Sequence, residues 1–346
     1  MKKGIFAASF LVIFWITGVA LAGVPGALDK SPAASLIVPF FEVGINSSTH
    51  PQDTLPVIYN RATTPTKIHW HVWDKNGNAT DLYGDKELSG NESYPLSMRV
   101  LIDGATSTVK SELDDGGTYY HGFVTIDVVT AETTKNPTES GYPFATGSSS
   151  NALEGFIYYV RIAEGSSNSL AMIPVNWVDP GADSYLTNLY QNSDEREEFA
   201  ASSRKCAELL ASGGAGPCTG DDTIDRVDSR VYLDPANNAI TRIILFTWDP
   251  TIIGGPSIYC DTHSCDSEYD YKQYDESGNL IADTTIRLPN VVNIITVSGS
   301  ANGLVSIQGI ADPDDDFSVY GFSLTNASPP SGTLNWDAIL PSYIEP

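Results

Sequence analysis

Positive charge is scarce in this chain. Its 346 residues include 19 Lys and Arg against 43 Asp and Glu, which gives a formal net charge of -24 at pH 7. A chain with this balance repels the phosphate backbone of nucleic acids and the anionic surface of membranes. We therefore exclude nucleic-acid binding and interpret the acidity as a source of solubility outside the cell, with cation binding as the alternative.

The motifs of common enzyme classes are also missing. The chain has no G-x-S-x-G nucleophile elbow, no H-E-x-x-H zinc motif and no phosphate-binding glycine loop. A glycosidase would need only two suitably spaced carboxylates, and a chain with 43 acidic residues contains many such pairs. We expect no enzymatic activity, and a secreted glycosidase-like enzyme is the enzymatic alternative.

Long apolar runs are missing after the first 22 residues. Residues 1–22 have two lysines near the start, an apolar run at residues 5–16 and a small-x-small motif that ends at Ala22. This is the layout of a secretory signal peptide, and its apolar core is too short to favour a membrane span. We predict cleavage near Ala22 and a secreted protein, extracellular, at the cell surface or periplasmic, with no integral membrane span.

Cysteine is rare, with four residues in two close pairs, Cys206 with Cys218 and Cys260 with Cys265. An even, locally paired set in an exported protein predicts disulfide bonds. Three connectivities are open, and we favour the two local bonds because each closes a short loop. Zinc is the alternative at the second pair, where His263 stands between the thiols, but an oxidising compartment and the lack of a C-x-x-C knuckle favour the disulfide.

The abundant residues indicate β-structure. Thr, Ser, Gly, Asn and Tyr are frequent, whereas charged residues make up only 18% of the chain, a mixture typical of extracellular β-proteins. Short apolar-rich runs alternate with clusters of Gly, Asn, Asp and Ser, and each run predicts a strand. The predicted strands span residues 35–43, 54–60, 67–73, 96–102, 119–129, 152–162 and 169–178 in a first region, and residues 239–248, 269–274, 281–288, 291–297, 303–310 and 319–325 in a second.

A different pattern separates the two regions. Ser193 and Asp194 can cap a helix whose apolar residues recur at helical intervals, and Gly213 and Gly214 can end it. We therefore predict an all-β fold of two tandem immunoglobulin-like or jelly-roll-type β-sandwich domains with one short helical insert between them. The predicted segments are a signal peptide (1–22), a flexible tether (23–34), a first sandwich (35–178), a disulfide-containing helical insert (179–230) and a second sandwich (231–346).

The two regions share sequence matches in the same order. Residues 54–60 match 241–247, residues 73–78 match 274–279, residues 122–126 match 303–307, residues 155–156 match 321–322, and Trp177 matches Trp336. Any single match is weak because β-sandwiches share such patterns, but five in order predict a tandem duplication. The offset between the copies falls along the chain, which requires shorter loops in the second copy.

The same pattern resembles that of secreted, largely uncharacterised bacterial proteins with tandem immunoglobulin-like β-sandwich repeats. The resemblance is carried by a strand ending at Asn60, an Asp-x-x-Gly turn at residues 74–77, the strand at 96–102 and a Gly-aromatic-Val-x-Ile strand at 122–126. It covers most of the mature chain, although its motifs are generic. The resemblance implies the fold and a location at the cell surface, and it implies no catalytic residue.

Residues 74–78, Asp-Lys-Asn-Gly-Asn, have oxygen-bearing side chains at alternate positions, as a calcium loop does. A calcium loop of the EF-hand kind needs its glycine at the sixth position. Gly77 is the fourth residue, where a hairpin turn favours a residue that tolerates a positive φ. The sequence therefore predicts a turn here and again at residues 275–279.

The better candidate for a calcium site is a cluster of four carboxylates within five residues: Asp312, Asp314, Asp315 and Asp316. Such carboxylates repel one another unless they are solvated or bind a hard cation, and calcium accepts a shell of oxygen ligands. A solvated acidic loop is the alternative. Apart from calcium at this cluster, we expect no cofactor.

Aromatic side chains offer a second candidate site. The 17 Tyr and 6 Trp could provide flat rings that stack on sugars, and the candidates for ligand stacking are Trp73, Tyr119, Tyr120, Tyr158 and Tyr159. The alternative is that these rings anchor the sandwich core, because strand alternation buries about half of them.

Two histidines offer a third candidate. His69 and His71 lie two apart on one predicted strand, so their rings project from the same face about 7 Å apart. With His121 as a third ligand they could hold a transition metal. Exposed polar residues on a strand are the alternative explanation.

Together these observations favour a non-enzymatic structural, adhesive or assembly protein of the bacterial cell surface. Its expected partners are other cell-surface or extracellular proteins, including copies of itself, which exposed strand edges could join. A carbohydrate- or calcium-binding extracellular module is one alternative, with glycans as partners, and the glycosidase-like enzyme is the other.

Overall fold

The computed structural model of the protein describes residues 32–44, 52–117, 119–137, 139, 141–145, 148–161, 166–175, 226–234, 239–248, 268–288, 290–299, 302–309, 318–327, 336–341 and 343–345. The predicted signal peptide, most of the predicted tether and residues 179–225 of the predicted helical insert lie outside the described residues. Ala33, near the end of the predicted tether, is buried and its N–H donates to Leu153 O at 2.7 Å, so the first part of the fold includes it.

Nine strands and two short helices form the first unit. A five-stranded sheet has the order β4-β3-β6-β1-β9 and a four-stranded sheet the order β5-β2-β7-β8, with antiparallel pairing throughout. The strands are β1 (Ser35–Val43), β2 (Gln52–Asn60), β3 (Thr66–Asp74), β4 (Ala79–Leu88), β5 (Ser93–Pro95), β6 (Tyr120–Val128), β7 (Leu153–Arg161), β8 (Ser166–Ala171) and β9 (Ile173–Val175).

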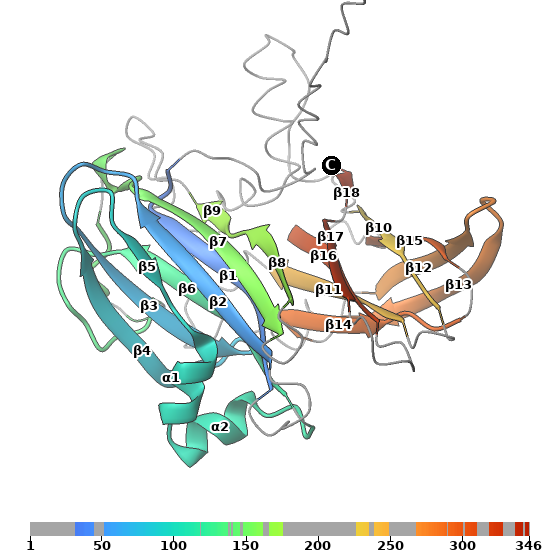
Figure 1. Ribbon diagram of the computed structural model, residues 1–346, viewed down its shortest axis with the longest axis horizontal. Helices are drawn as coiled ribbons and strands as arrows, with labels where there is room; N and C mark the ends of the chain where they lie inside the picture. The colour runs from blue at the N-terminus through green and yellow to red at the C-terminus, as the bar shows by residue number, and fades with distance from the viewer. Residues whose placement is uncertain are drawn as a thin grey trace, which may run out of the picture.

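The second unit has the same strand order as the first. Its sheets run β13-β12-β15-β10-β18 and β14-β11-β16-β17, so adding nine to each strand number of the first unit gives the second. The strands are β10 (Arg226–Val231), β11 (Ile240–Trp248), β12 (Glu268–Asp275), β13 (Leu280–Arg287), β14 (Val292–Thr296), β15 (Gly303–Gly309), β16 (Ser318–Ala327), β17 (Trp336–Pro341) and β18 (Tyr343–Glu345). Figure 1 shows the first unit, blue to green, beside the second, yellow to red.

In each unit the two sheets pack as close layers. A Cβ added to Gly155 on β7 would lie 2.9 Å from the Leu36 side chain on β1, across the layers. Its counterpart Gly321 on β16 would approach the Val227 side chain on β10 to 2.5 Å. Glycine therefore stands where a strand of one sheet approaches a side chain of the other most closely.

One threonine bridges two strands in the same way in both units. Thr54 Oγ1 accepts a hydrogen bond from Glu42 N at 2.9 Å and donates one to Glu42 O at 3.0 Å. Thr241 Oγ1 accepts from Tyr232 N at 3.0 Å and donates to Tyr232 O at 2.7 Å. Glu42 and Tyr232 therefore occupy equivalent positions, although their side chains differ completely.

The predicted turns at residues 74–78 and 275–279 are confirmed. Asp74 Oδ1 accepts from the N–H groups of Asn76 and Asn78 at 2.9 and 2.8 Å, and Gly77 has a φ of 89°. The second turn repeats these bonds to its own aspartate, and Gly278 has a φ of 81°. The aspartate oxygens that a calcium loop would use are bonded within the turn.

A glycine on the neighbouring strand pairs with the first residue of each turn, and the reason is steric. Gly122 pairs with Asp74, and a Cβ there would lie 2.1 Å from Trp73 O. Gly303 pairs with Asp275, and its Cβ would lie 1.9 Å from Tyr274 O. No side chain fits at either position, which explains why both glycines occur in the sequence match.

One of the sequence matches is wrong in register. Arg161 on β7 pairs with Ser166 on β8, whereas Ala327 on β16 pairs with Trp336 on β17. Because Gly155 and Gly321 are equivalent, Trp336 corresponds to Ser166 rather than to Trp177. Trp177 itself lies outside the described residues.

The strand predicted at residues 96–102 is also wrong, because helices stand there: α1 (Met98–Gly104) and α2 (Ser107–Leu113). Ser97 Oγ accepts from Val100 N at 3.2 Å and caps α1. Met98 and Ile102 are four residues apart and buried, while Val100 is 70% exposed, as expected of a helix that packs on one face. Residues 226–230, placed at the end of the predicted insert, belong to strand β10.

Within the described residues, the helices therefore lie inside the first unit, between β5 and β6. The second unit connects the equivalent strands β14 and β15 in a few residues and has no such helices there. This difference explains part of the falling offset between the matched segments. Neither helix is long enough to cross a membrane in the part of the chain that the structure describes.

Candidate functional site at the joint between the two units

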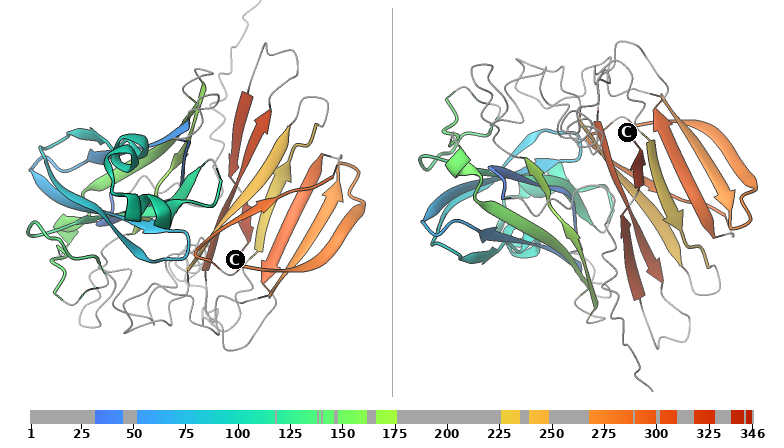
Figure 2. Two further views of the ribbon diagram at one scale, coloured as in Figure 1. Left: turned by 90° about the horizontal axis from the view of Figure 1, so that it is seen from below. Right: turned by 90° about the horizontal axis from the view of Figure 1, so that it is seen from above.

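The two units meet end to face. The strands β1, β3 and β7 finish at one end of the first unit, and β6 begins there. We call this end the first turn end, because it carries the turn at residues 74–78. This end packs against the outer face of the second unit's four-stranded sheet, as both views in Figure 2 show. Val292 N donates to Lys75 O at 3.0 Å. Aromatic rings also meet there, Phe123 with Phe246 at 5.3 Å and Tyr159 with Phe322 at 6.1 Å between centroids.

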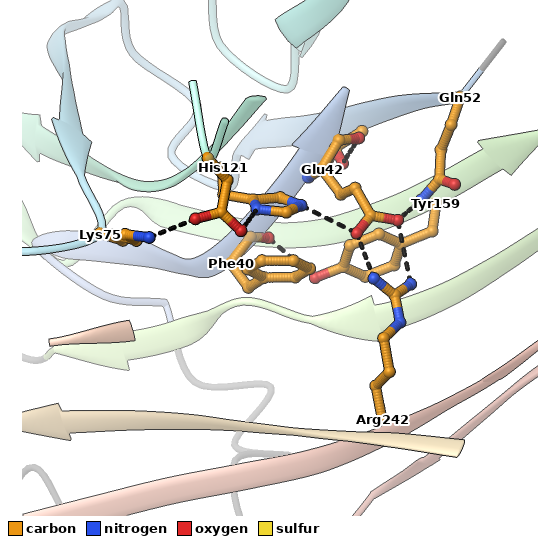
Figure 3. Close-up of polar contacts among 9 residues, drawn as sticks. Phe40, Glu42, Gln52, Lys75, His121, Tyr159 and Arg242 are labelled. Carbon is orange, nitrogen blue, oxygen red and sulfur yellow. Dashed lines mark hydrogen bonds and ion pairs between the residues drawn. The ribbon is translucent and has the colours of Figure 1, made fainter. Parts of the chain in front are cut away.

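Glu42 lies at the centre of this joint. Its side chain is 1% exposed, at the end of a strand that is buried along its whole length. Both carboxylate oxygens accept hydrogen bonds from the Arg242 guanidinium, and Arg242 Nη2 lies 3.0 Å from Glu42 Oε1. Gln52 Nε2 donates to Oε1 at 2.7 Å, and His121 Nε2 lies 3.0 Å from Oε2 (Figure 3).

A line of charged groups continues from Glu42 toward the surface. His121 Nδ1 lies 3.5 Å from Asp115 Oδ2, and Asp115 pairs with Lys75. The side chains of Lys75 and Asp115 are more than a third exposed, whereas His121 is 7% exposed. Carboxylates therefore alternate with basic side chains along the line from the buried Arg242 to the partly exposed Lys75 (Figure 3).

The joint fixes the charge state of Glu42. Burial alone would raise the pKa of its carboxyl, but the charges and hydrogen bonds of Arg242 and His121 together hold that pKa well below its usual range. Glu42 is therefore ionised at any physiological pH. Because both of its oxygens are engaged by partners, the carboxylate acts here as the anchor of a joint and has no oxygen left to serve as a general base.

Sequence reasoning missed Glu42 and Arg242, which are 200 residues apart. One signal was present: a glutamate stands in the otherwise apolar run of residues 36–43. A carboxylate is almost never fully buried without a partner, so this run called for an arginine, a lysine or a histidine elsewhere in the chain. The sequence does not identify which of the 19 Lys and Arg or the 5 His that is.

A second buried polar cluster lies on β3 and its neighbours. The rings of His69 and His71 are 6.1 Å apart, close to the predicted spacing. Both side chains are buried, so the expectation of exposed strand polar residues is wrong. His69 Nδ1 lies 3.0 Å from Asp85 Oδ1, and the Tyr83 ring stacks on His71 with an interplanar angle of 3°.

Burial sets the ionisation of this cluster. It lowers the pKa of His69 and lowers that of His71 to about 3, so both rings are neutral at pH 7. On the neighbouring strand β6, burial raises the pKa of Asp127 to about 6, although Ser35 and Tyr142 donate hydrogen bonds to it. At pH 7 the two histidine rings are therefore neutral, whereas Asp127, with a pKa of about 6, is largely ionised inside the fold.

The predicted metal site is not assembled around this histidine pair. His121, the predicted third ligand, binds Glu42 and Asp115 in the joint instead. Among the residues that the structure describes, no group of three His, Cys, Asp or Glu side chains has the arrangement of a metal site.

The five aromatic residues predicted to stack on a ligand do not form one surface. Trp73, Tyr120 and Tyr159 are buried, and a buried ring has no face to offer to a sugar. Trp73 stacks on Phe123 with a centroid distance of 5.8 Å, so it anchors the core near the joint. Tyr119 and Tyr158 are partly exposed; Tyr119 directly precedes β6 of the five-stranded sheet, and Tyr158 lies on β7 of the four-stranded sheet.

Two predicted sites fall outside the described residues. These are the cysteines Cys206, Cys218, Cys260 and Cys265, and the acidic cluster Asp312, Asp314, Asp315 and Asp316. The disulfide and calcium predictions therefore stay predictions.

Comparison with known proteins identifies no relative of this chain. No protein family model matches it, and no curated protein sequence is similar to it. Among solved structures, a lectin of Pleurotus ostreatus in its apo form is similar at 8% identity, with a TM-score of 0.18 over 92% of this chain and 78% of the lectin. The same lectin in complex with GalNAc gives 8% identity and a TM-score of 0.19 over 91% and 83% of the two chains. Similarity at this level carries no argument about fold or function.

Proposed function

We propose that this chain is a non-enzymatic structural or assembly protein that works outside the cytoplasm, at the cell surface or in the extracellular space. We further propose that it arose by tandem duplication of one immunoglobulin-like β-sandwich. The equal strand order, the two bridging threonines and the two identical turns support the duplication. A duplicated β unit without a recognisable catalytic motif suits a building element better than an enzyme.

The observation that carries the proposal is the filled joint. A two-domain glycosidase would place its carboxylates in a cleft between the domains. Here the space between the units holds aromatic rings in contact, Phe123 edge-on against Phe246, and a carboxylate whose oxygens are bonded to Gln52, His121 and Arg242. Such a joint keeps the two units in one orientation, as a component that bears or transmits force requires.

Assembly by strand addition is disfavoured at two sheet edges. The edge strand β4 carries Asp81, Asp85 and Glu87, and the edge strand β13 carries Asp283 and Arg287. Charges on an edge strand discourage pairing with another chain. We therefore expect the sheet faces, rather than these edges, to mediate contacts between molecules.

Sedimentation velocity of the mature chain over a wide concentration range tests the proposal. We expect larger species to accumulate as the concentration rises, both with calcium and with a chelator. A chain that stays monomeric at every concentration under both conditions contradicts the proposal. Turnover of a glycoside panel would support the enzyme alternative, and specific hits on a glycan array would support the binding-module alternative.

A further inference from the structure

The second unit has a turn end of its own. It consists of the turn at residues 275–279 with Tyr232, Leu280, Ile281 and Leu304 beside it. Leu280 and Ile281 are 50% and 49% exposed, and Leu304 and Tyr232 are partly exposed. The equivalent residues of the first unit are Ala79 and Thr80, and Thr80 is 3% exposed. At these two positions the second turn end therefore presents larger apolar side chains than the first turn end does.

The first unit has the matching face. In the joint, the first turn end covers the outer face of the sheet formed by β14, β11, β16 and β17. The equivalent outer face in the first unit, on the sheet formed by β5, β2, β7 and β8, carries side chains that are partly exposed rather than buried. These are Leu55, Val57 and Tyr59 on β2, and Phe156 and Tyr158 on β7.

Pairing of equivalent positions shows how closely this face resembles its counterpart. Val57 pairs with Phe156, as Ile244 pairs with Phe322. Ile244 and Phe322 are fully buried and belong to the face covered by the joint. Tyr59 contacts the Phe156 ring edge-on at 6.2 Å, which makes a continuous aromatic patch. The first unit thus has an apolar face of the kind that the second unit buries.

The charged pair of the joint is replaced at both positions. Thr54 and Thr241 are equivalent, so Leu55 corresponds to Arg242, and Tyr232 corresponds to Glu42. A contact that repeats the joint between molecules would therefore bring Tyr232 against Leu55. Both are uncharged, so neither leaves a buried charge without a partner. If only one of the two positions had changed, the repeated contact would have buried a charge without a partner.

We infer that the second turn end of one molecule docks on the outer face of the first unit's four-stranded sheet in another copy of this chain. The contact repeats the intramolecular joint between molecules. Because the two surfaces differ and lie on different units, the contact is heterologous, and its repetition joins molecules head to tail into a chain that stays open unless the rotation closes a ring. This inference rests on the proposed assembly function and names the surfaces that carry it.

Two single variants and their mixture test the inference. Val57→Glu places a charge in the face, and Leu304→Glu places one in the second turn end. Each variant retains one intact surface, so each alone should sediment as a monomer at concentrations where the unmodified chain assembles. An equal mixture should form a dimer and no larger species, because one intact face meets one intact turn end. Thr285→Glu, at an exposed position of β13, is the matched control and should assemble as the unmodified chain does.

Circular dichroism and thermal melting decide whether each variant is folded. Tyr158→Glu replaces Val57→Glu if the latter fails to fold, and Tyr232→Glu replaces Leu304→Glu. If folded variants on both surfaces still assemble, or if the mixture behaves as its separate components do, the inference is wrong while the assembly function stands. If face variants block assembly and turn-end variants do not, the contact is face to face and the inference is wrong. A monomeric unmodified chain refutes both proposals.

Discussion

Removing one charge of the buried pair in the joint should destabilise the protein strongly. In Glu42→Gln the shape of the side chain is kept, but Arg242, whose side chain is 17% exposed, loses its counter-charge. In Arg242→Met the carboxylate, 1% exposed, loses its two guanidinium hydrogen bonds. Breaking a buried ion pair by removing one partner costs about 3–5 kcal/mol. We expect each single variant to lose a free energy of unfolding of this size.

The double variant Glu42→Gln/Arg242→Met measures the interaction between the two side chains apart from the contacts that each makes with other residues. Neither residual charge is then buried alone, so the loss should be smaller than the sum of the two single losses by more than about 1 kcal/mol, or about fivefold in the unfolding equilibrium. Equilibrium urea unfolding, followed by tryptophan fluorescence, provides the values. Lys67→Met, which removes a 3.8 Å pair with the exposed Glu132, is the control and should cost less than about 1 kcal/mol. Additive losses, or single losses as small as that of the control, would refute the role of Glu42 as the anchor of the joint.

Four further predictions concern the first unit. The pKa of His71 is about 3 in the folded protein and 6.5 in the unfolded chain, so the unfolded chain binds more protons between these values. The free energy of unfolding should therefore fall as the pH drops from about 6.5 toward 3. Urea midpoints measured against pH should show a weaker fall in His71→Phe. Asp127 acts in the opposite direction, because its pKa of about 6 in the folded protein exceeds the unfolded value of 3.8. Asp127→Asn should therefore gain stability relative to the unmodified chain as the pH rises from about 4 to 6. A gain that does not depend on pH would contradict this. Gly122→Ala should cost about 1–3 kcal/mol through its contact with a backbone oxygen, whereas Gly104→Ala, which meets nothing within 4 Å, should cost no stability through a steric clash in the same unfolding experiment. Asp74→Ala should lower the thermal midpoint equally with calcium and with a chelator, since its oxygens bond to the turn, and a calcium-dependent difference would revive the ion-loop interpretation.

Local patterns were the part of the fold that the sequence could predict. The turn at residues 74–78 depends on bonds between residues at most four apart and on one glycine with a positive φ. The glycine at position 122 is dictated by one carbonyl oxygen on the neighbouring strand. Constraints of this kind recur in the second unit with the same residue types, so an ordered set of sequence matches found them.

Features that depend on distant residues could not be predicted in this way. Residues 96–102 contain enough apolar residues for a strand, and only the cap at Ser97 and the burial of Met98 and Ile102 distinguish a helix. The joint depends on Glu42 and on an arginine 200 residues later, and no local pattern connects them. The aromatic residues failed as a predicted ligand surface for the same reason, because burial of Trp73 and Tyr159 is decided by the contact between sheets and units.

The predicted mode of association also changed with the structure. Sequence reasoning placed contacts at exposed strand edges, whereas two edge strands carry several charges each. The surfaces that repeat an existing joint are the outer face around Val57 and the second turn end around Leu280. Comparison of the two units with each other thus leads to a proposed interface that neither unit shows alone.

Electron microscopy of the mature protein at high concentration tests the central claim most directly. We expect unbranched chains in which two-lobed molecules follow one another head to tail, with a repeat of one molecule along the chain. Leu304→Glu should abolish these chains and leave two-lobed single particles. Closed two-fold dimers, or single particles of the unmodified chain at every concentration, would contradict the account.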